Sequence, residues 1–382
     1  MRRLIHGRAL VGSELREVTV VLDGPRIAAV RGEKGAPAGA VQVSGVLAPG
    51  FVDVHVHGGA GADFMDADPE AVRRICAFHA RHGTVALAAT TLTAGRAAIR
   101  DAVAAAAAVA AAPGRDEARV AAVHLEGPYL NPARAGAQDP QELRGADRGE
   151  VEEWLAAGEG LPFLMTIAPE VPGALDLIAA LSRRLRFSIG HTEASHEVVR
   201  TALARGARHF THLFNAMPPL HHRTPGVVGA ALAAEEATVE LIADGQHVHP
   251  LLLAACARLM GDRVALVTDA MRACGMPPGA YRLARLEVRV EDGAARLPDG
   301  TLAGSLLTMA GAVRTMVHDA GVPLARVLPL ASTVPAGLLG LPGKGRIAAG
   351  ADADLVELDP ELRVVRTWIA GEEVAGEVGG PG

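Results

Sequence analysis

The sequence predicts an α/β protein built on a TIM-like (β/α)8 barrel, with a small β-sandwich domain assembled from both ends of the chain. Through the middle of the chain, short apolar runs alternate with Ala- and Arg-rich helical stretches, which is typical of repeated βα units. Eight such runs occur, and eight parallel strands close a barrel of this kind. The two ends of the chain share a different pattern, in which short predicted strands are separated by turns.

The order of these patterns divides the chain into two domains. At the N-terminal end, apolar and polar residues alternate and are interrupted by turn-forming residues, as in REVTVVLDGPRIAAV, and the C-terminal end shows the same pattern. We therefore expect residues 1–48 and 343–382 to form the small domain and residues 49–342 to form the catalytic barrel. The runs expected to be barrel strands are, in order, VLAPGFVDV, TVALAATTL, RVAAVHL, FLMTIAP, LRFSIG, ARHFTHL, TVELIAD and VALVTD.

Composition excludes several classes of function. The chain has 382 residues, a formal net charge of −6 and 3% aromatic residues, so neither a basic field nor stacking platforms for nucleic acid are expected. Cys76, Cys256 and Cys274 have no CxxC spacing, which fits a reducing cytoplasm. The N-terminus lacks an apolar leader, and AVAAAAAVAAA is too short to cross a bilayer. We expect a cytoplasmic protein with no membrane partner.

Polar residues gather at the ends of the predicted strands, where barrel enzymes place their chemistry. His55 and His57 alternate in GFVDVHVHGG, so both point to one face of the first strand. The other strand ends carry Glu126 in HLEGP, His191 in SIGHTEA, His212 in FTHLFNAM and Asp269 in LVTDA. Imidazole and carboxylate together suit divalent metal ions. We expect one or two ions per subunit, zinc first, with iron, cobalt or manganese as alternatives.

Each of these residues also has an ordinary structural interpretation. A histidine on a strand is commonly a hydrogen-bonded core residue, and Glu126 or Asp269 can simply cap a loop or helix. Five strands ending in His, Glu or Asp at one edge favour the metal interpretation. His124 is expected to point the same way as Glu126 but deeper. Surface or core roles are expected for His79, His82, His196, His209 and His318.

The chemistry of the cluster follows from its ligand types. The lysines, Lys34 and Lys344, lie away from the predicted strand ends, so Glu126 rather than a modified lysine is expected to be shared between ions. A metal ion brings the pKa of water to about 7 and polarises a carbonyl group. Asp269 is not needed for the His/His/Glu set, so we expect it to transfer the proton, which typically contributes roughly 10²–10⁴-fold.

The motifs resemble those of the amidohydrolase superfamily and, within it, the N-acetylglucosamine-6-phosphate deacetylase family. The match runs from APGFVDVHVHGG through HLEGPYLN, IGHTEA, THLFNAMPPLHHRTPG, IADGQHVHP, LVTDA and TLAGSLLTM to GKGRIAAGADADLV. The resemblance implies hydrolysis of the sugar N-acetyl group by metal-activated water, giving glucosamine 6-phosphate and acetate. It implies one ion on Glu126, His191 and His212, room for a second at His55 and His57, and Asp269 as general base and acid.

The resemblance also implies a sugar-phosphate site and a homodimer whose subunits share the phosphate site. The substrate residues that it implies are Ala137, Gln138, Asn215, Ala216, Arg223, Asp244, His247, Leu302, Ala303 and Gly304. Arg223 lies in MPPLHHRTPG, where a guanidinium can bind phosphate through two hydrogen bonds, although an ordinary solvated loop is the alternative.

One position departs from the family pattern, and two other functions stay open. After HLEGPYLN the family usually has Gly-Ala-His, whose His helps to polarise the substrate carbonyl, whereas this chain has Gln138. A glutamine amide can donate a hydrogen bond but cannot carry a positive charge. The first alternative is another amidohydrolase, acting on a different N-acyl sugar, an N-acyl amino acid or a cyclic amide. The second is a non-catalytic scaffold, which the complete ligand set disfavours.

Overall fold

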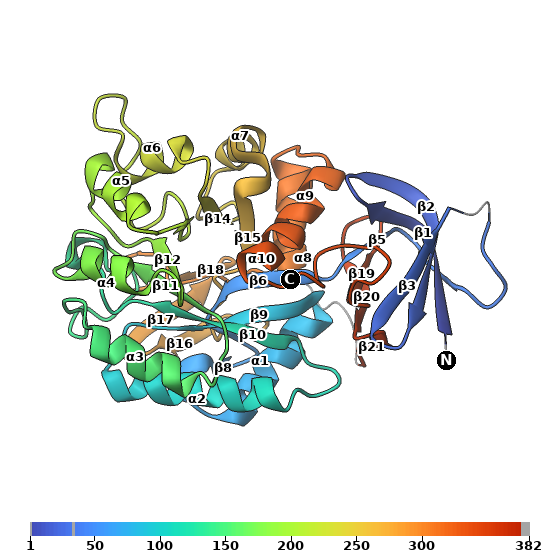
Figure 1. Ribbon diagram of the computed structural model, residues 1–382, viewed down its shortest axis with the longest axis horizontal. Coiled ribbons are helices and arrows are strands. Elements are labelled where there is room, and N and C mark those ends of the chain that lie inside the picture. The colour runs from blue at the N-terminus through green and yellow to red at the C-terminus, as the bar shows by residue number, and fades with distance from the viewer. Residues whose placement is uncertain (1, 33–34, 376–382) are drawn as a thin grey trace.

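The computed structural model describes residues 2–32 and 35–375 and confirms the predicted barrel. Within those residues, eight parallel strands form one sheet in the order β6-β9-β10-β11-β12-β13-β14-β15 (Figure 1). Their bounds are β6 (Phe51–Val56), β9 (Thr84–Thr91), β10 (Arg119–Glu126), β11 (Phe163–Ile167), β12 (Arg186–Ile189), β13 (His209–Phe210), β14 (Thr238–Ile242) and β15 (Val264–Val267). β9 is buried along its whole length, as expected for a strand covered on both faces.

Helices alternate with the strands, and α1 to α7 each follow one strand of the barrel. The helices are α1 (Pro69–Arg81), α2 (Arg96–Ala111), α3 (Arg148–Ala157), α4 (Ala174–Leu181), α5 (His196–Ala204), α6 (Gly226–Ala233), α7 (Pro250–Met260), α8 (Met309–Arg314), α9 (Leu324–Ala331) and α10 (Thr333–Leu338). Short 3₁₀ turns are η1 (Phe64–Asp66), η2 (Pro132–Arg134) and η3 (Gly261–Arg263), and η4 (Thr315–Asp319) is a π-helical turn. The N-terminus of α1 is capped, because the Asp68 side chain accepts a hydrogen bond from Glu70 N, and Pro69 is the first helical residue.

The Ala-rich run of the sequence is part of α2, a helix of the barrel wall. The buried residues Ile99, Val103 and Val109 lie on the same helix as buried alanines, so this face packs inward. None of the helices in the described ranges has the length and hydropathy needed to span a bilayer.

Strands from both chain ends form a second, mixed sheet beside the barrel. Its order is β21-β20-β19-β5-β1-β2-β3, with β4 paired to β1. The strands are β1 (Arg2–Val11), β2 (Glu14–Asp23), β3 (Arg26–Arg31), β4 (Val41–Gln42), β5 (Val46–Pro49), β19 (Leu355–Leu358), β20 (Val364–Ile369) and β21 (Glu372–Glu373). Ile5 and Leu22 from the first part of the chain pack with Leu355 and Trp368 from the last part. Figure 1 shows β19 and β20 beside β1, β2 and β3, at the right of the view.

The predicted strand VLAPGFVDV is divided between the two sheets at Gly50. Residues before it form β5 of the mixed sheet, and residues after it form β6 of the barrel. A Cβ atom on Gly50 would lie 2.3 Å from Cγ1 of Val85, so only glycine permits this close approach to β9. Two small sheets were not anticipated: β7 (Gly58–Gly59) with β8 (Ala62–Asp63), and β16 (Gly279–Leu283) with β17 (Leu286–Glu291) and β18 (Ala294–Arg296).

The first and last barrel strands meet beside the candidate site. Asp269 N donates to the carbonyl oxygen of His55 over 2.8 Å, and His57 N donates to that of Ala270 over 2.9 Å. These contacts bring the end of β15 against the end of β6. Asp269 is thereby held next to the two histidines of the first strand.

Candidate functional site

Side chains from the carboxyl ends of the barrel strands converge on Glu126, the last residue of β10. Oε1 of Glu126 lies 3.1 Å from Nε2 of His191 and 3.1 Å from Nε2 of His212. Its other oxygen, Oε2, lies 3.1 Å from Nε2 of His57. His55 and His57 face each other with 3.2 Å between their Nε2 atoms. Two ion-sized groups therefore share Glu126: one with His55 and His57, the other with His191 and His212.

The hydrogen bonds of the Nδ1 atoms, which face away from Glu126, fix the tautomer of two of these rings. Nδ1 of His191 lies 2.8 Å from the carbonyl oxygen of Arg134, and Nδ1 of His57 lies 3.3 Å from that of Thr90. A carbonyl oxygen only accepts, so each Nδ1 carries the hydrogen. The lone pair of a neutral ring then sits on Nε2 and points at the Glu126 carboxylate. This is the form in which imidazole binds a metal ion.

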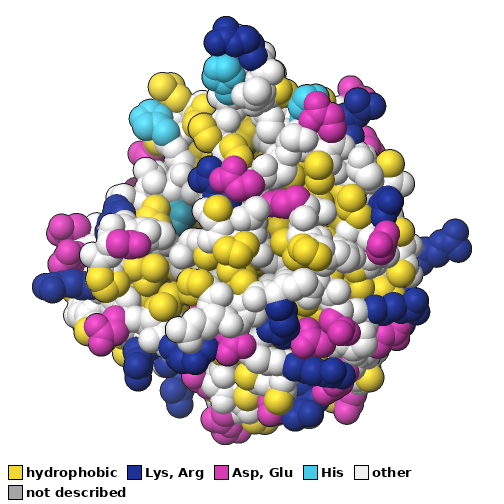
Figure 2. Space-filling model, turned by 90° about the vertical axis from the view of Figure 1, so that its left-hand side faces the viewer, with side chains coloured by type: hydrophobic (Ala, Val, Ile, Leu, Met, Phe, Trp, Pro, Cys, Tyr) yellow, Lys and Arg dark blue, Asp and Glu magenta, His cyan; other side chains and the backbone are white. Residues whose placement is uncertain are grey.

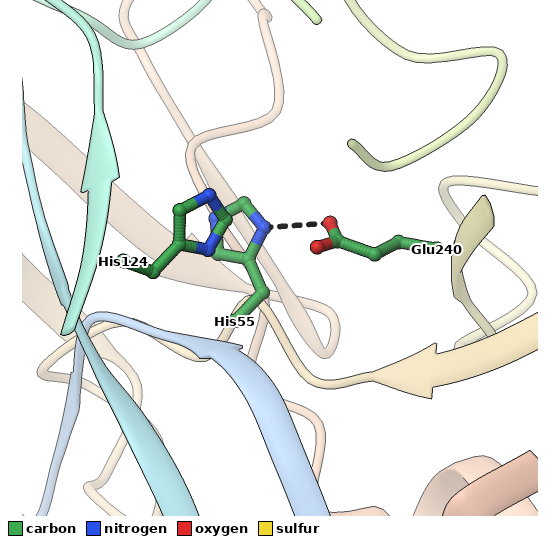
Figure 3. Close-up of side chains that lie close together, drawn as sticks. All are labelled: His55, His124 and Glu240. Carbon is green, nitrogen blue, oxygen red and sulfur yellow. Dashed lines mark hydrogen bonds and ion pairs between the residues drawn. The ribbon is translucent and has the colours of Figure 1, made fainter. Parts of the chain in front are cut away.

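His55 has the same form, because its Nδ1 donates to Oε2 of Glu240 over 2.9 Å (Figure 3). A third possible ion group, His55 with His124 and Glu240, does not suit an ion. Nδ1 of His124 donates to the Val54 carbonyl over 3.0 Å, and its Nε2 accepts from the Thr166 hydroxyl over 2.7 Å. Burial lowers the pKa of His124 to about 3, so the ring stays neutral with both nitrogens in use.

The electrostatics of the cluster favour a cation at its centre. Burial opposes a charge on Glu126, but the surrounding histidines, His55 first, hold the pKa of this carboxyl well below its usual range. Burial likewise opposes protonation of His57, but hydrogen bonds to Asp269 and Glu126 raise the pKa of its ring to about 9. The carboxylates are thus ionised and draw positive charge between them. A divalent ion supplies that charge and leaves the imidazoles neutral.

Three of the converging residues have left-handed backbone conformations. The φ angles are 48° at His191, 27° at His212 and 48° at Asp269. Such angles are uncommon for residues other than glycine and typically cost about 1–3 kcal/mol each. All three stand just beyond the end of a barrel strand, where the chain turns and the side chain faces the cluster. Strain of this kind gathers at functional sites.

Asp269 stands at the side of the first ion group. Its Oδ1 lies 3.2 Å from Nε2 of His57 and 3.6 Å from Nε2 of His55. Burial works to raise the pKa of this carboxyl, but the charge on His55 and the hydrogen bond to His57 lower it. Ser305 N donates to the carbonyl oxygen of Asp269 over 2.7 Å, so the main chain is held from both sides. The carboxylate is ionised and can accept a proton.

Gln138 is buried against Glu126 and has a fixed orientation. Its Oε1 accepts from Thr93 N over 2.7 Å, and its Nε2 donates to Oε2 of Glu126 over 2.5 Å. A main-chain N–H only donates, so the amide cannot be turned the other way. Gln138, which stands where the family usually has a histidine, thus donates a hydrogen bond from a neutral amide to the Glu126 carboxylate that both ion groups share.

A cavity of about 550 Å³ opens over the cluster. The sequence-predicted residues that line it are His57, Glu126, Ala137, Gln138, His191, His212, Asn215, Ala216, His247, Asp269, Leu302 and Gly304. Ala303 is fully buried between two lining residues, and His55 lies below the cavity floor. Asp244 does not line the cavity, but its Oδ2 accepts from Nδ1 of His247 over 2.7 Å and orients that ring.

Arg223 lies outside the cavity of its own chain. It is exposed in the loop that precedes α6, which projects from the barrel in Figure 1. Figure 2 shows basic side chains and histidines gathered on the projection at the top of this face. His221 and His222 precede Arg223 in the same exposed loop. The structure therefore does not bring Arg223 into the cavity of its own subunit.

Two arginines that the sequence did not single out do line the cavity. Arg134 is paired with Glu193, whereas Nη1 of Arg296 donates only to the Gly300 carbonyl, over 3.0 Å. Arg296 has no carboxylate partner among the residues that the structure describes. It reaches the cavity on β18, part of the sheet inserted after β15, and no pattern in the sequence indicated that sheet.

Lys344 does not join the cluster. Lys344 contacts Asp354 and Asp352 in the mixed-sheet part of the chain, the latter at 3.2 Å. Lys34 lies outside the described residues. Glu126 is accordingly the group that both ion groups share.

Comparisons with known proteins agree with this geometry. Residues 46–374 match the model of the Amidohydrolase family. The chain is 39% identical over 329 residues to N-acetylgalactosamine-6-phosphate deacetylase of Escherichia coli O157:H7, covering 86% of this chain and 87% of that one. It is 38% identical over 330 residues to N-acetylglucosamine-6-phosphate deacetylase of Vibrio furnissii, covering 86% and 82%.

A solved structure is similar over nearly the whole chain. It is a variant of N-acetyl-D-glucosamine-6-phosphate deacetylase from Mycobacterium smegmatis in complex with N-acetyl-D-glucosamine-6-phosphate. The TM-score is 0.93 at 38% identity, and the match covers 98% of this chain and 100% of the other.

Proposed function

Because the chain belongs to the amidohydrolase family, we propose that it hydrolyses the N-acetyl group of N-acetylglucosamine 6-phosphate, releasing acetate and glucosamine 6-phosphate. The observation that carries this proposal is the convergence of histidine Nε2 atoms on the Glu126 carboxylate. The Nδ1 atoms of His55, His57 and His191 are engaged by acceptors, so their Nε2 lone pairs face the cluster. A scaffold without chemistry has no need for this arrangement.

The donor set fits one divalent ion in each of the two groups around Glu126. Imidazole nitrogens and a carboxylate suit zinc first, with iron, cobalt or manganese as alternatives. When bound, such an ion polarises the acetyl carbonyl and lowers the pKa of water to about 7.

Asp269 transfers the proton in the proposed reaction. It accepts a proton from the attacking water as the carbon–oxygen bond forms. It returns that proton to the sugar nitrogen as the carbon–nitrogen bond breaks, so that the amine leaves neutral. The place of Asp269 beside His57, at the wall of the cavity, supports this role.

The remaining cavity residues bind the sugar phosphate. Asn215, Ala216 and His247 are proposed to contact the phosphate side, and Leu302 and Gly304 the acetyl and sugar side, whereas the buried Ala303 does not reach the cavity. The bond from His247 to Asp244 leaves the far edge of that ring available to a ligand. Arg296 adds a cation to the wall of the cavity and completes a site suited to a phosphate.

We also propose a homodimer in which Arg223 reaches the phosphate site of the partner subunit. Exposed leucines support this arrangement, because three of the four lie on one helix, α7, and several exposed large apolar side chains on one helix are typical of an interaction surface. The exposed fractions are 51% for Leu220, beside Arg223, and 75%, 45% and 68% for Leu251, Leu252 and Leu259 on α7. Such residues are typical of the buried centre of a subunit interface.

A second substrate is favoured by the relatives themselves. The Escherichia coli relative, at 39% identity, is named for the N-acetylgalactosamine 6-phosphate reaction. The two sugars differ only in configuration at C4, so the same acetyl and phosphate contacts serve both.

A panel of four substrates tests the proposal. Acetate release is measured with N-acetylglucosamine 6-phosphate, N-acetylgalactosamine 6-phosphate, unphosphorylated N-acetylglucosamine and an N-acetyl amino acid. We expect either phosphorylated sugar to exceed both unphosphorylated compounds by at least about tenfold in kcat/KM, the value of one charge-assisted hydrogen bond. Equal rates with and without phosphate, or a preference for the amino acid, would favour a different amidohydrolase.

A further inference from the structure

Glu240 is a buried carboxylate inside the barrel, next to the ion-binding cluster. It is the third residue of β14, its exposed fraction is 0%, and it does not line the cavity. It therefore touches neither substrate nor the position of an ion. A charged group in such surroundings persists only when hydrogen-bond donors surround it.

The donors around Glu240 come from both ion groups. Its Oε2 accepts from Nδ1 of His55 over 2.9 Å and from the main-chain N of His212 over 3.1 Å. Its Oε1 accepts from Nε2 of His209 over 2.9 Å. The main-chain oxygen of Glu240 accepts from Leu213 N over 2.9 Å. One side-chain oxygen thus holds a ligand of the first group and a ligand of the second.

The contact with His55 fixes the ring of that ligand. Because Oε2 of Glu240 accepts the Nδ1 hydrogen, the lone pair of His55 lies on Nε2, which faces His57 across 3.2 Å. Figure 3 shows the ring held between Glu240 and the His124 ring, whose centroid is 4.5 Å away. The ring cannot rotate without losing the bond to the carboxylate.

The contact with His212 fixes the main chain of the other ligand. His212 has a φ angle of 27°, a left-handed conformation that a histidine rarely adopts. The two successive N–H groups of this turn, at His212 and Leu213, both donate to Glu240. This pair of bonds holds the turn that aims His212 at Glu126.

We propose that Glu240 is a positioning residue that sets the affinity of both ion groups at once. The inference rests on the proposed function, because it assumes an ion in each group. Loss of a hydrogen-bond partner behind a metal ligand typically lowers metal affinity by about 10- to 100-fold. Glu240 stands behind one ligand of each group, so its removal weakens both ions.

The experiment compares Glu240→Ala and Glu240→Gln with the wild-type chain. Apo-protein is titrated with Zn²⁺ against a chelating dye, which gives two dissociation constants, and apo-protein unfolding in urea is followed separately. For Glu240→Ala we expect both dissociation constants to rise by about 10- to 100-fold. For Glu240→Gln we expect a smaller rise in both dissociation constants, because the amide oxygen can still accept hydrogen bonds from His55 and His212.

A spectroscopic signature separates positioning from simple stability. In wild-type apo-protein, at a pH alkaline enough to leave the ring neutral, ¹⁵N spectra of the histidine rings should show the hydrogen on Nδ1 of His55. Glu240→Ala removes the acceptor, so we expect this tautomer to lose its dominance. Glu150 provides the matched control, as a buried glutamate bonded to Tyr129 and Arg144 with no contact to an ion ligand. Glu150→Gln should lower stability and leave both dissociation constants and the His55 tautomer unchanged.

The outcomes are distinct. Dissociation constants within about twofold of wild type in both Glu240 variants, or a loss confined to one ion, would overturn the inference and leave the proposed function standing. A wild-type chain that binds no divalent ion would overturn both. If Glu240→Ala does not fold, the Zn²⁺ titration of Glu240→Gln alone tests the inference. Dissociation constants equal to those of wild type in this variant would then overturn it.

Discussion

Thr268 and Asp53 join the last and first strands of the barrel beneath the ion-binding cluster. The Thr268 hydroxyl donates to Oδ2 of Asp53 over 2.5 Å, and Oδ1 of Asp53 accepts from Thr268 N and His55 N at 3.3 Å and 3.2 Å. Asp269 directly follows Thr268, so the same contacts hold the proposed proton-transfer group beside the first ion group. One buried carboxyl therefore contributes both to the closure of the barrel and to the geometry of the site.

We expect Asp53→Ala to destabilise the apo-protein strongly. The substitution leaves two buried main-chain donors, Thr268 N and His55 N, without their acceptor, and each such donor costs roughly 1–3 kcal/mol. Asp53→Asn is the matched control, because its amide oxygen still accepts from both main-chain N–H groups. Urea unfolding should show Asp53→Ala less stable by roughly 2–5 kcal/mol and Asp53→Asn much closer to wild type. Equal stability of the two variants would exclude the proposed clamp.

We expect Asp269→Asn to lose activity and retain the ions. The amide cannot accept a proton from water or return one to the amine, so kcat should fall by about 10²–10⁴-fold. Metal content per chain, measured by mass spectrometry of the dialysed protein, should stay at the wild-type value. Turnover within a few-fold of wild type would remove Asp269 from the mechanism.

We expect Gln138 to affect kcat in two ways, through its hydrogen bond to Glu126 and through a hydrogen bond to the acetyl oxygen of the substrate. Gln138→Ala removes the donor to Glu126 and the acceptor for Thr93 N, so kcat should fall, by less than the roughly 10²–10³-fold typical of a lost oxyanion donor. A histidine can supply one donor and one acceptor, so Gln138→His should match or exceed wild type on N-acetylglucosamine 6-phosphate. If kcat of both variants stays within about twofold of wild type, Gln138 has no part in the reaction.

The shared phosphate site predicts complementation between subunits. Arg223→Ala should raise KM for the phosphorylated sugar by roughly 10- to 150-fold, equivalent to 1.5–3 kcal/mol, and hardly affect the unphosphorylated sugar. Mixing Arg223→Ala chains with His247→Ala chains should restore some intact sites, because each mixed dimer contains one site with both residues native. No gain on mixing would place Arg223 outside the phosphate site of either subunit.

The sequence predicted the barrel and the ligands because both follow from periodic patterns. Alternation places His55 and His57 on one face, and strand ends necessarily meet at one edge of a parallel barrel. The left-handed turns at His191 and His212 could not be predicted, because neither residue type demands such a conformation. The turn at His212 depends on Glu240, which the neighbouring strand β14 supplies.

Other parts of the site lay beyond sequence reasoning for similar reasons. Glu240 sits in the apolar run TVELIAD, where a lone glutamate gives no sign of its partners. Arg296 reaches the cavity on a sheet inserted after β15, and the path of that insertion depends on packing alone. Arg223 was expected at a phosphate site shared between two subunits, and its place outside the cavity of its own chain is a property of the fold.

In the proposed reaction, hydrolysis depends on ions held around Glu126. The most direct measurement titrates Zn²⁺ into apo-protein and follows acetate release from N-acetylglucosamine 6-phosphate, with Glu126→Gln in parallel. We expect wild-type activity to rise from near zero and to saturate at about two ions per chain. Glu126→Gln, which replaces the ligand shared by both groups, should bind ions weakly and stay inactive at that ratio. Full activity of the ion-free wild type, or wild-type ion binding and turnover in Glu126→Gln, would contradict the account.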